Sequence, residues 1–499
     1  MSKQSTRGID DAGAPDHPSR SDGFVRGVSG LIGGPLGDHA AALDRPVGRE
    51  RHFWTAARIV LALVCLTLAL HWVQKSPCQD GAWTNNVQYT RFCYTDVLAL
   101  YYAEGLNEGK VPYRDHPVEY PVLTGYFMGA LGLPVHALGV DDPGLNQGMW
   151  FYNANVLVLG ALAVATAAAL LALRRRRPWD VALFALAPAL LLTATVNWDF
   201  LAIGLAAFGL LAWARRRPVL AGLLLGLGGA AKLWPLFLFW PILLLAIRAS
   251  RLRAALAAIG AGAAALLVVN LPTALLYPTN WARFLELNTE RPIDWGTLWY
   301  IGRYLDGKVG GGGGLGPFEW LNANVPVLNN LSYALFLLAC VGVAVLVLVA
   351  PRRPRLAQLA FLVVAAFLIF SKVWSQQFVL WLLPLAVLAR PKWGAFLAWQ
   401  LAEVAYFAAF YGELLGTSTG RPVFPEGVFV LAATLRLTTV VILCALIVRE
   451  ILRPELDAVR GTYADDPDGG VVAGAPDAPW LRRRPSRKTL DPAPEPAAT

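Results

Sequence analysis

Long apolar runs that recur along the chain constrain its fold more than any other feature of the sequence. They are roughly 15 to 24 residues long, close to the ~20 residues that a helix rising 1.5 Å per residue needs to cross a bilayer. The runs are continuous rather than alternating, which excludes membrane-spanning strands. The sequence therefore predicts an all-α polytopic membrane protein.

The composition agrees with this class. Of the 499 residues, 56% are hydrophobic and only 15% are charged, and the mean hydropathy is +0.47. Soluble domains have a charged fraction near a quarter. The net charge of +9 would suit a nucleic-acid partner, but the basic residues cluster at the ends of apolar runs. They indicate membrane topology instead, and we expect no nucleic-acid binding.

The two ends of the chain have a different composition. Residues 1–56 and 449–499 are rich in Gly, Pro, Ala, Asp and Arg and contain no apolar run of spanning length. Such segments cannot bury enough apolar surface to offset the entropy of folding. We predict a disordered cytoplasmic arm, a membrane domain over residues 57–448 and a disordered cytoplasmic tail.

About twelve spans are predicted when the basic clusters are placed on the cytoplasmic side. The spans lie near residues 57–73, 150–173, 179–196, 199–214, 219–230, 233–247, 255–276, 331–350, 357–371, 376–390, 392–411 and 426–448. The clusters are Arg174–Arg177, Arg215–Arg217, Arg248–Arg253, Pro351–Arg355 and Arg390–Lys392. If the apolar run 121–139 were also a span, Arg174–Arg177 would lie on the outer side of the membrane. We therefore interpret this run as a re-entrant or juxtamembrane segment in the first outer loop.

That loop carries the most unusual polar residues, Tyr94–Asp96 and Glu119–Pro121. Carboxylates beside a bilayer are costly unless they serve a function, which favours catalysis at the membrane surface. The loop also contains Cys78 and Cys93, on a side where oxidation is permitted. Their disulfide would contribute about 3 kcal/mol through loop closure; the alternative is two unpaired thiols.

Downstream of Cys93 the loop has an Asp a few residues before a Tyr pair, a Gly with a following ProTyr, and a TyrPro that leads into an apolar run. In these motifs the chain resembles glycosyltransferase family 87 of the GT-C superfamily, polytopic enzymes that take sugars from polyprenyl-phosphate carriers. The matching positions are Asp96, Tyr101 or Tyr102, Gly109, Pro112, Tyr113, Tyr120 and Pro121, followed by Gly228–Pro235, Glu290–Trp295 and Ser371–Gln377.

The resemblance implies an inverting sugar transfer in a GT-C-like helix bundle, with Asp96 as the catalytic base. A positioned carboxylate can remove the proton of a sugar hydroxyl as the anomeric carbon is attacked. Glu119 ranks second, as a base or as an acceptor-binding group. Asp80 and Asp115 are more typical of solvated loop charges, and Asp199 of a helix N-terminus.

The leaving group would be a lipid phosphate, whose growing charge needs cationic donors. The candidates are Lys232, Lys372, Arg291 and Arg303, with Lys232 and Lys372 favoured because each directly follows a predicted span. The alternative is that these lysines only extend to the interface. Aromatic residues Tyr102, Tyr113 and Tyr120 complete the predicted binding residues.

We expect no cofactor and no metal ligand set, because the six His residues lack ligand spacing. The predicted partners are the bilayer, a polyprenyl-phosphate sugar, with mannose or arabinose as its sugar, and a glycan or glycolipid acceptor outside the plasma membrane. Alternatives are a flippase or transporter of a polyprenyl-linked lipid, or a non-catalytic scaffold for envelope assembly. A transporter would carry charged residues within its helices. The predicted helices contain almost none, and Glu403 is the main exception.

Overall fold

The computed structural model describes residues 16–31, 53–309 and 316–481. Within these ranges the chain forms α-helices and short 3-10 helices, with no strand and one isolated bridge between Pro112 and His116. The predicted all-α class is confirmed for this part of the chain.

Six helices in the described ranges are long and apolar enough to cross a membrane. They are α4 (Ala56–Lys75), α7 (Val122–Asp141), α8 (Gln147–Leu173), α14 (Leu252–Leu276), α18 (Val325–Val349) and α22 (Glu426–Leu452). Shorter apolar helices lie between them: α11 (Asp199–Ala214), α12 (Pro218–Ala231), α13 (Phe239–Arg248), α19 (Leu356–Phe370) and α20 (Val379–Ala389). These helices support a membrane protein, while the number of about twelve spans stays a prediction.

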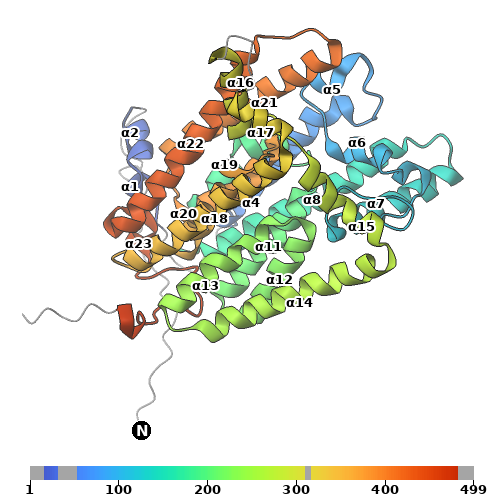
Figure 1. Ribbon diagram of the computed structural model, residues 1–499. Coiled ribbons are helices and arrows are strands. Elements are labelled where there is room, and N and C mark those ends of the chain that lie inside the picture. The colour runs from blue at the N-terminus through green and yellow to red at the C-terminus, as the bar shows by residue number, and fades with distance from the viewer. Residues whose placement is uncertain (1–15, 32–52, 310–315, 482–499) are drawn as a thin grey trace, which may run out of the picture.

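Small residues allow the closest helix contact in the bundle. Gly222 and Gly226 of α12 face Ala258 and Gly262 of α14, and a Cβ atom added at Gly226 would lie 2.2 Å from the Gly262 carbonyl oxygen. Residues of this size let two backbones approach closely in a bilayer, where dispersion contacts rather than water drive association. The helices α11, α12 and α14 therefore form one tightly packed layer (Figure 1).

The span predicted over residues 179–196 is not one helix. The chain forms the 3-10 helix η4 (Pro178–Val181), then α9 (Ala182–Ala185) and α10 (Pro188–Thr193). Proline lacks an amide proton and disfavours helical geometry in the residue before it, and Ala187 is extended in the structure. The break lets the chain after α10 turn toward the outer loop segment.

Both ends of α7 contact the same end of the bundle. The Thr124 hydroxyl near its start donates to the carbonyl of Ala231, the last residue of α12, and Tyr126 bonds Thr273 near the end of α14. Gly139 near its end packs against Gln147, the first residue of α8. A helix of this length measures about 30 Å. The length and composition of α7 fit a span, and its re-entrant or juxtamembrane placement stays a prediction.

Short helices gather at this end of the bundle. They are α5 (Val87–Thr90), α6 (Asp96–Ala103), α15 (Pro278–Glu290), α16 (Leu298–Val309) and α17 (Pro317–Ala323). Figure 1 places α5, α6 and α15 beyond the ends of the long helices, and α23 (Ala458–Thr462) at the opposite end. We call the two ends the cavity end and the arginine end.

The arginine end contradicts the prediction of wholly disordered termini. Residues 16–31 form α1 (Pro18–Ser21) and α2 (Gly23–Leu31), and residues 453–481 continue past α22 through η7 (Pro454–Leu456), α23 and η8 (Pro479–Leu481). The expectation of disorder therefore does not hold for residues 16–31 and 449–481. Residues 1–15, 32–52 and 482–499 lie outside the described ranges.

Buried ion pairs explain this order. Asp468 binds Arg174 after α8 at 2.7 Å, and Asp457 binds Arg355 before α19 at 2.7 Å, with all four side chains almost fully buried. Asp477 pairs with Arg248 at the end of α13. Arginines that the sequence marks only as topology signals are thus the docking points of the C-terminal segment, because a buried guanidinium needs a carboxylate partner.

Candidate active site

A cavity of about 690 Å³ lies at the cavity end of the bundle. Its polar lining includes six of the residues predicted from the sequence. One lies on α6, two lie in the loop before α7, and the other three lie just after α12, α15 and α19. The six residues are Asp96, Glu119, Tyr120, Lys232, Arg291 and Lys372. Segments that the predicted topology assigned to one side of the membrane therefore meet at one site.

One wall of the cavity is apolar and largely aromatic. Its side chains come from the 3-10 helix η5 (Trp234–Leu238) and from α15, α18 and α19. They include Phe237, Phe284, Leu285, Tyr333, Phe336, Phe367 and Phe370. The cavity therefore offers charged groups at one place and a hydrophobic surface at another.

Asp96 is the first residue of α6, and its position follows from the residues before it. Thr95 is the N-cap: its hydroxyl accepts from the Val97 amide and donates to the carbonyl of Thr195. The Asp96 amide donates to the Val196 carbonyl at 2.8 Å. The helix start is thus fixed to the turn between α10 and α11, and the N-terminus of a helix favours a carboxylate.

The Asp96 carboxylate is half-buried and surrounded by donors. Asn197 Nδ2 donates to Oδ2 at 2.8 Å, and Gln377 Nε2 lies 3.4 Å from the same oxygen. The same Asn197 amide also reaches the Tyr120 hydroxyl. Burial raises the pKa of Asp96 above its usual range, while hydrogen bonds from Asn197 and Tyr94 and the charge of Lys232 act in the opposite direction.

The turn that carries Asn197 is held by buried polar groups. His71 of α4 bonds the Leu191 carbonyl and the Thr195 hydroxyl, both at 2.7 Å. The Tyr152 hydroxyl of α8 also bonds the Thr195 hydroxyl. Hydrogen bonds from two long helices thus fix the loop that positions Asn197 beside Asp96.

Lys232 is held in a preformed pocket. Its Nζ atom lies 2.8 Å from Oδ1 of the fully buried Asp199 and within 6 Å of the ring centroids of Tyr120, Phe378 and Trp381. These rings stabilise the cation through their π faces. Asp199 also accepts from the Trp381 indole at 2.6 Å, so its side chain orients Lys232 rather than capping α11.

Lys372 also lines the cavity and is as buried as Lys232, but it has different partners. Its Nζ atom donates to the Thr289 carbonyl at 3.3 Å, and no carboxylate pairs with it among the described residues. Burial and the nearby Arg291 lower the pKa of Lys372 to about 8. Arg291 is half-exposed and only loosely paired with Asp294, at 3.9 Å. Lys372 and Arg291 are therefore the cations best placed to meet an anionic ligand.

Glu119 lines the cavity without a side-chain hydrogen bond or ion pair in the described part of the chain. Burial and the neighbouring Asp96 raise the pKa of Glu119, while Arg291, Arg283 and Lys232 oppose this shift. Two carboxylates with raised pKa values therefore face one cavity, which is typical of acid–base sites.

Three residues predicted for the site lie outside the cavity. Arg303 of α16 is engaged by Glu319 at 2.6 Å, which leaves it unsuited to hold a ligand in this cavity. Tyr113 is fully buried, packs against Gly125 and donates to the Tyr120 carbonyl, so it supports the wall. Tyr102 is half-exposed, and its hydroxyl lies against Gly81 and Gly148.

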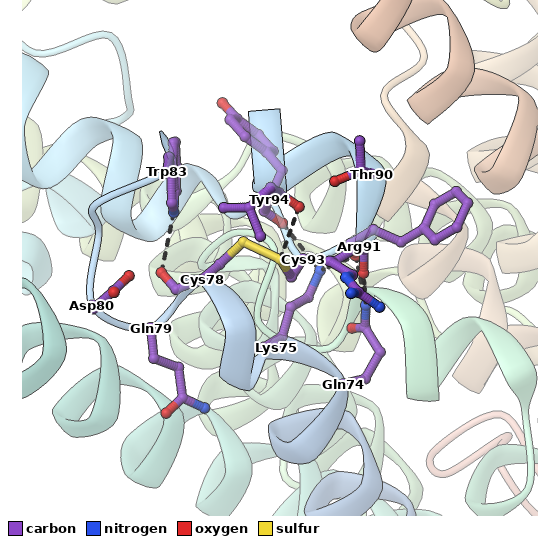
Figure 2. The surroundings of a disulfide bond; sticks show 12 residues. Gln74, Lys75, Cys78, Gln79, Asp80, Trp83, Thr90, Arg91, Cys93 and Tyr94 are labelled. Atoms are coloured by element: carbon purple, nitrogen blue, oxygen red, sulfur yellow. Dashed lines mark hydrogen bonds between the residues drawn. A yellow bond between two sulfur atoms is a disulfide. The ribbon is translucent and has the colours of Figure 1, made fainter. Parts of the chain in front are cut away.

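Cys78 and Cys93 form a disulfide in the structure (Figure 2). It closes the segment that contains η2 (Thr84–Asn86) and α5, and it ends three residues before Asp96. Trp83 donates its indole proton to the Cys78 carbonyl within this segment. The bond thus restrains the chain that enters α6.

Sequence reasoning missed Asn197, Gln377 and Lys75 as neighbours of Asp96. Gln377 ends the Ser371–Gln377 motif, and Asn197 lies two residues before Asp199. In the sequence, Asn197 is 101 residues and Gln377 is 281 residues from Asp96. Only the close approach of two polar motifs identifies them. No group of three or more potential metal ligands exists among the described residues.

The family model for glycosyltransferase family 87 matches residues 127–372. Over this segment the chain is similar to members of glycosyltransferase family 87. The family implies a membrane glycosyltransferase, in agreement with the apolar helices. The match includes Lys232, Arg291 and Lys372, whereas Asp96 and Glu119 precede it. A search of curated proteins gave no match.

Proposed function

We propose that this family 87 glycosyltransferase moves a sugar, mannose or arabinose, from a polyprenyl-phosphate carrier to a lipid-linked or cell-envelope glycan. The observation that carries the proposal is a cavity in which a half-buried carboxylate, three cations and an aromatic wall meet. A lipid-borne sugar phosphate needs each of these surfaces. The acceptor needs a base, the phosphate needs cations, and the lipid chain needs an apolar surface.

In the proposed reaction Asp96 acts as the general base. The acceptor hydroxyl oxygen attacks the anomeric carbon from the face opposite the phosphate, and its proton passes to Asp96. The bond between the anomeric carbon and the phosphate oxygen breaks, so the configuration inverts and polyprenyl phosphate leaves. Asn197 and Gln377 hold the carboxylate in place for this transfer.

The cations stabilise the charge that develops on the leaving phosphate. Lys372 and Arg291 have no close carboxylate partner that would compete with this ligand. Lys232 is matched by Asp199 and supplies a fixed charge nearer to Asp96. Glu119 binds the acceptor or takes the role of base, and the aromatic wall receives the first isoprene units.

The cavity end is assigned to the outer face of the plasma membrane. The buried arginines and the C-terminal segment occupy the opposite end, and basic residues are enriched on the cytoplasmic side of membrane proteins. Both termini are cytoplasmic in this arrangement.

The test is the Asp96→Asn variant, assayed as purified protein with defined polyprenyl-phosphate mannose and arabinose donors. Loss of a general base lowers kcat by about a hundredfold or more. The amide keeps an oxygen for the Asn197 bond, so we expect the variant to fold with a thermal unfolding temperature close to that of the wild type.

The matched control is Asp115→Asn, which removes an exposed carboxylate from the same loop that is bonded to Arg114. This variant should transfer sugar at the wild-type rate. Near-normal transfer by Asp96→Asn would reject Asp96 as the base, and absence of transfer by the wild type from either donor would reject the donor class.

A further inference from the structure

Lys75, the last residue of α4, is a buried cation that the proposed reaction does not yet explain. Its side chain is fully buried, and its Nζ atom donates to the carbonyl oxygens of Phe92 at 3.3 Å and Tyr94 at 3.0 Å. Within the described ranges no carboxylate forms an ion pair with it. A lysine at a helix end normally extends its amine to water. This one is directed into the protein, beneath the disulfide (Figure 2).

The two carbonyls that Lys75 binds flank Cys93 and lead to the proposed base. Tyr94 is two residues before Asp96, and its hydroxyl is hydrogen-bonded to the Asp96 carboxylate. Gln74 adds a second bond from α4, to the Phe92 carbonyl at 2.6 Å. The end of α4 therefore holds the backbone of residues 92–94 in place by side-chain donors.

When Lys75 is protonated, its charge attracts the ionised Asp96 carboxylate. The other titratable groups around Asp96 come from several elements: Lys232 after α12, Asp199 of α11, Glu119 and Tyr120 before α7, Tyr94 before α6, and Tyr411 of α21 (Trp393–Thr419). Lys232 is already paired with Asp199. In this group Lys75 is the cation without a paired carboxylate among the described residues.

We propose that Lys75 is a positioning residue for Asp96, because its hydrogen bonds fix the chain that enters α6 and its amine places a positive charge near the carboxylate. The inference rests on the proposed role of Asp96 as the base. Lys75 itself does not touch the substrates, since it lies beneath the backbone of residues 92–94 and does not line the cavity.

The experiment compares Lys75→Gln with Lys75→Arg in the full-length protein. Glutamine keeps a donor and removes the charge, whereas arginine keeps both. For Lys75→Gln we expect the acid limb of the kcat/KM profile to move to higher pH by about one unit, because loss of a nearby cation raises the pKa of a carboxylate. Lys75→Arg should retain the wild-type profile. The KM for the donor should change little in either variant.

The control is Lys110→Met, which removes a half-exposed lysine of the same loop that is paired with Glu108. It should leave the profile unchanged. An unchanged acid limb in Lys75→Gln would overturn the inference, as would failure of both Lys75 variants to fold, which would make Lys75 a structural anchor only. Activity that persists in Asp96→Asn would instead reject the proposed base, so the two failures are distinguishable.

Discussion

Lys232 and Lys372 line the same cavity but have different surroundings. Lys232 is paired with a buried carboxylate and enclosed by three aromatic rings, so its charge is fixed before any ligand binds. Among the described residues the Lys372 amine hydrogen-bonds one backbone carbonyl and no carboxylate, and its pKa is lowered to about 8. Of the two, Lys372 is the residue whose charge changes in the range where enzymes are assayed.

This difference predicts that binding of the proposed donor weakens at alkaline pH. Below about pH 8 Lys372 is protonated and attracts the phosphate, and above it the amine becomes neutral, so kcat/KM for the donor should fall as pH rises through about 8. Kinetics across this range measure the effect. Lys372→Arg should shift the fall to higher pH, because arginine stays protonated. A flat wild-type profile above pH 8 would contradict the assignment.

At the scale of elements, three kinds of contact restrain the segment from the end of α4 to the start of α6. The Cys78–Cys93 disulfide, the Lys75 bonds and the Thr95 cap all act on the few residues that precede Asp96. A short helix of eight residues such as α6 is marginal by itself. Its position therefore depends on these contacts.

Removal of the disulfide tests this dependence. The variant Cys78→Ser/Cys93→Ser should lose about 3 kcal/mol of stability for a loop of this length, and its transfer rate should fall because the entry to α6 is less restrained. Thermal unfolding and sugar transfer measure the two effects. The control is Cys65→Ser, which changes an exposed free cysteine of α4. A double variant as stable and as active as the wild type would argue against the restraint.

At the scale of the whole molecule, the bundle separates the cavity end from the arginine end. The long helices connect the two, and the C-terminal segment joins loops after α8 and α13 and before α19 through Asp468, Asp477 and Asp457. These pairs tie together helices whose remaining contacts are mostly apolar. The segment thus contributes to the relative placement of the helices that end at the cavity.

The variant Asp468→Asn tests this contribution. It leaves the Arg174 guanidinium buried without its carboxylate, and breaking such a pair from one side costs about 3 to 5 kcal/mol. The thermal unfolding temperature of the full-length protein should fall clearly. Glu455→Gln, which changes an exposed residue of η7 with no ion pair among the described residues, should not alter it. Equal unfolding temperatures for both variants would show that the segment is dispensable.

The apolar helices could be predicted from the sequence because spanning length and hydropathy are local properties. The polar motifs near Asp96, Lys232 and Lys372 could be assigned to one side of the membrane because basic clusters report topology. The same reasoning did not distinguish Arg291, which lines the cavity, from Arg303, which Glu319 engages. Both arginines lie in one predicted loop, and the local sequence does not indicate which of them lines the cavity and which forms an ion pair with Glu319.

Tertiary structure alone decided the contacts between distant segments. Asn197 and Gln377 reach Asp96 from 101 and 281 residues away, and Arg174 pairs with Asp468 across 294 residues. The tail that binds Arg174 has the composition of a disordered segment. It is ordered by buried ion pairs together with a few buried apolar side chains, such as Val459 and Val472. The apolar helices and the polar motifs thus follow from the sequence by itself, and folding determined which groups lie beside Asp96.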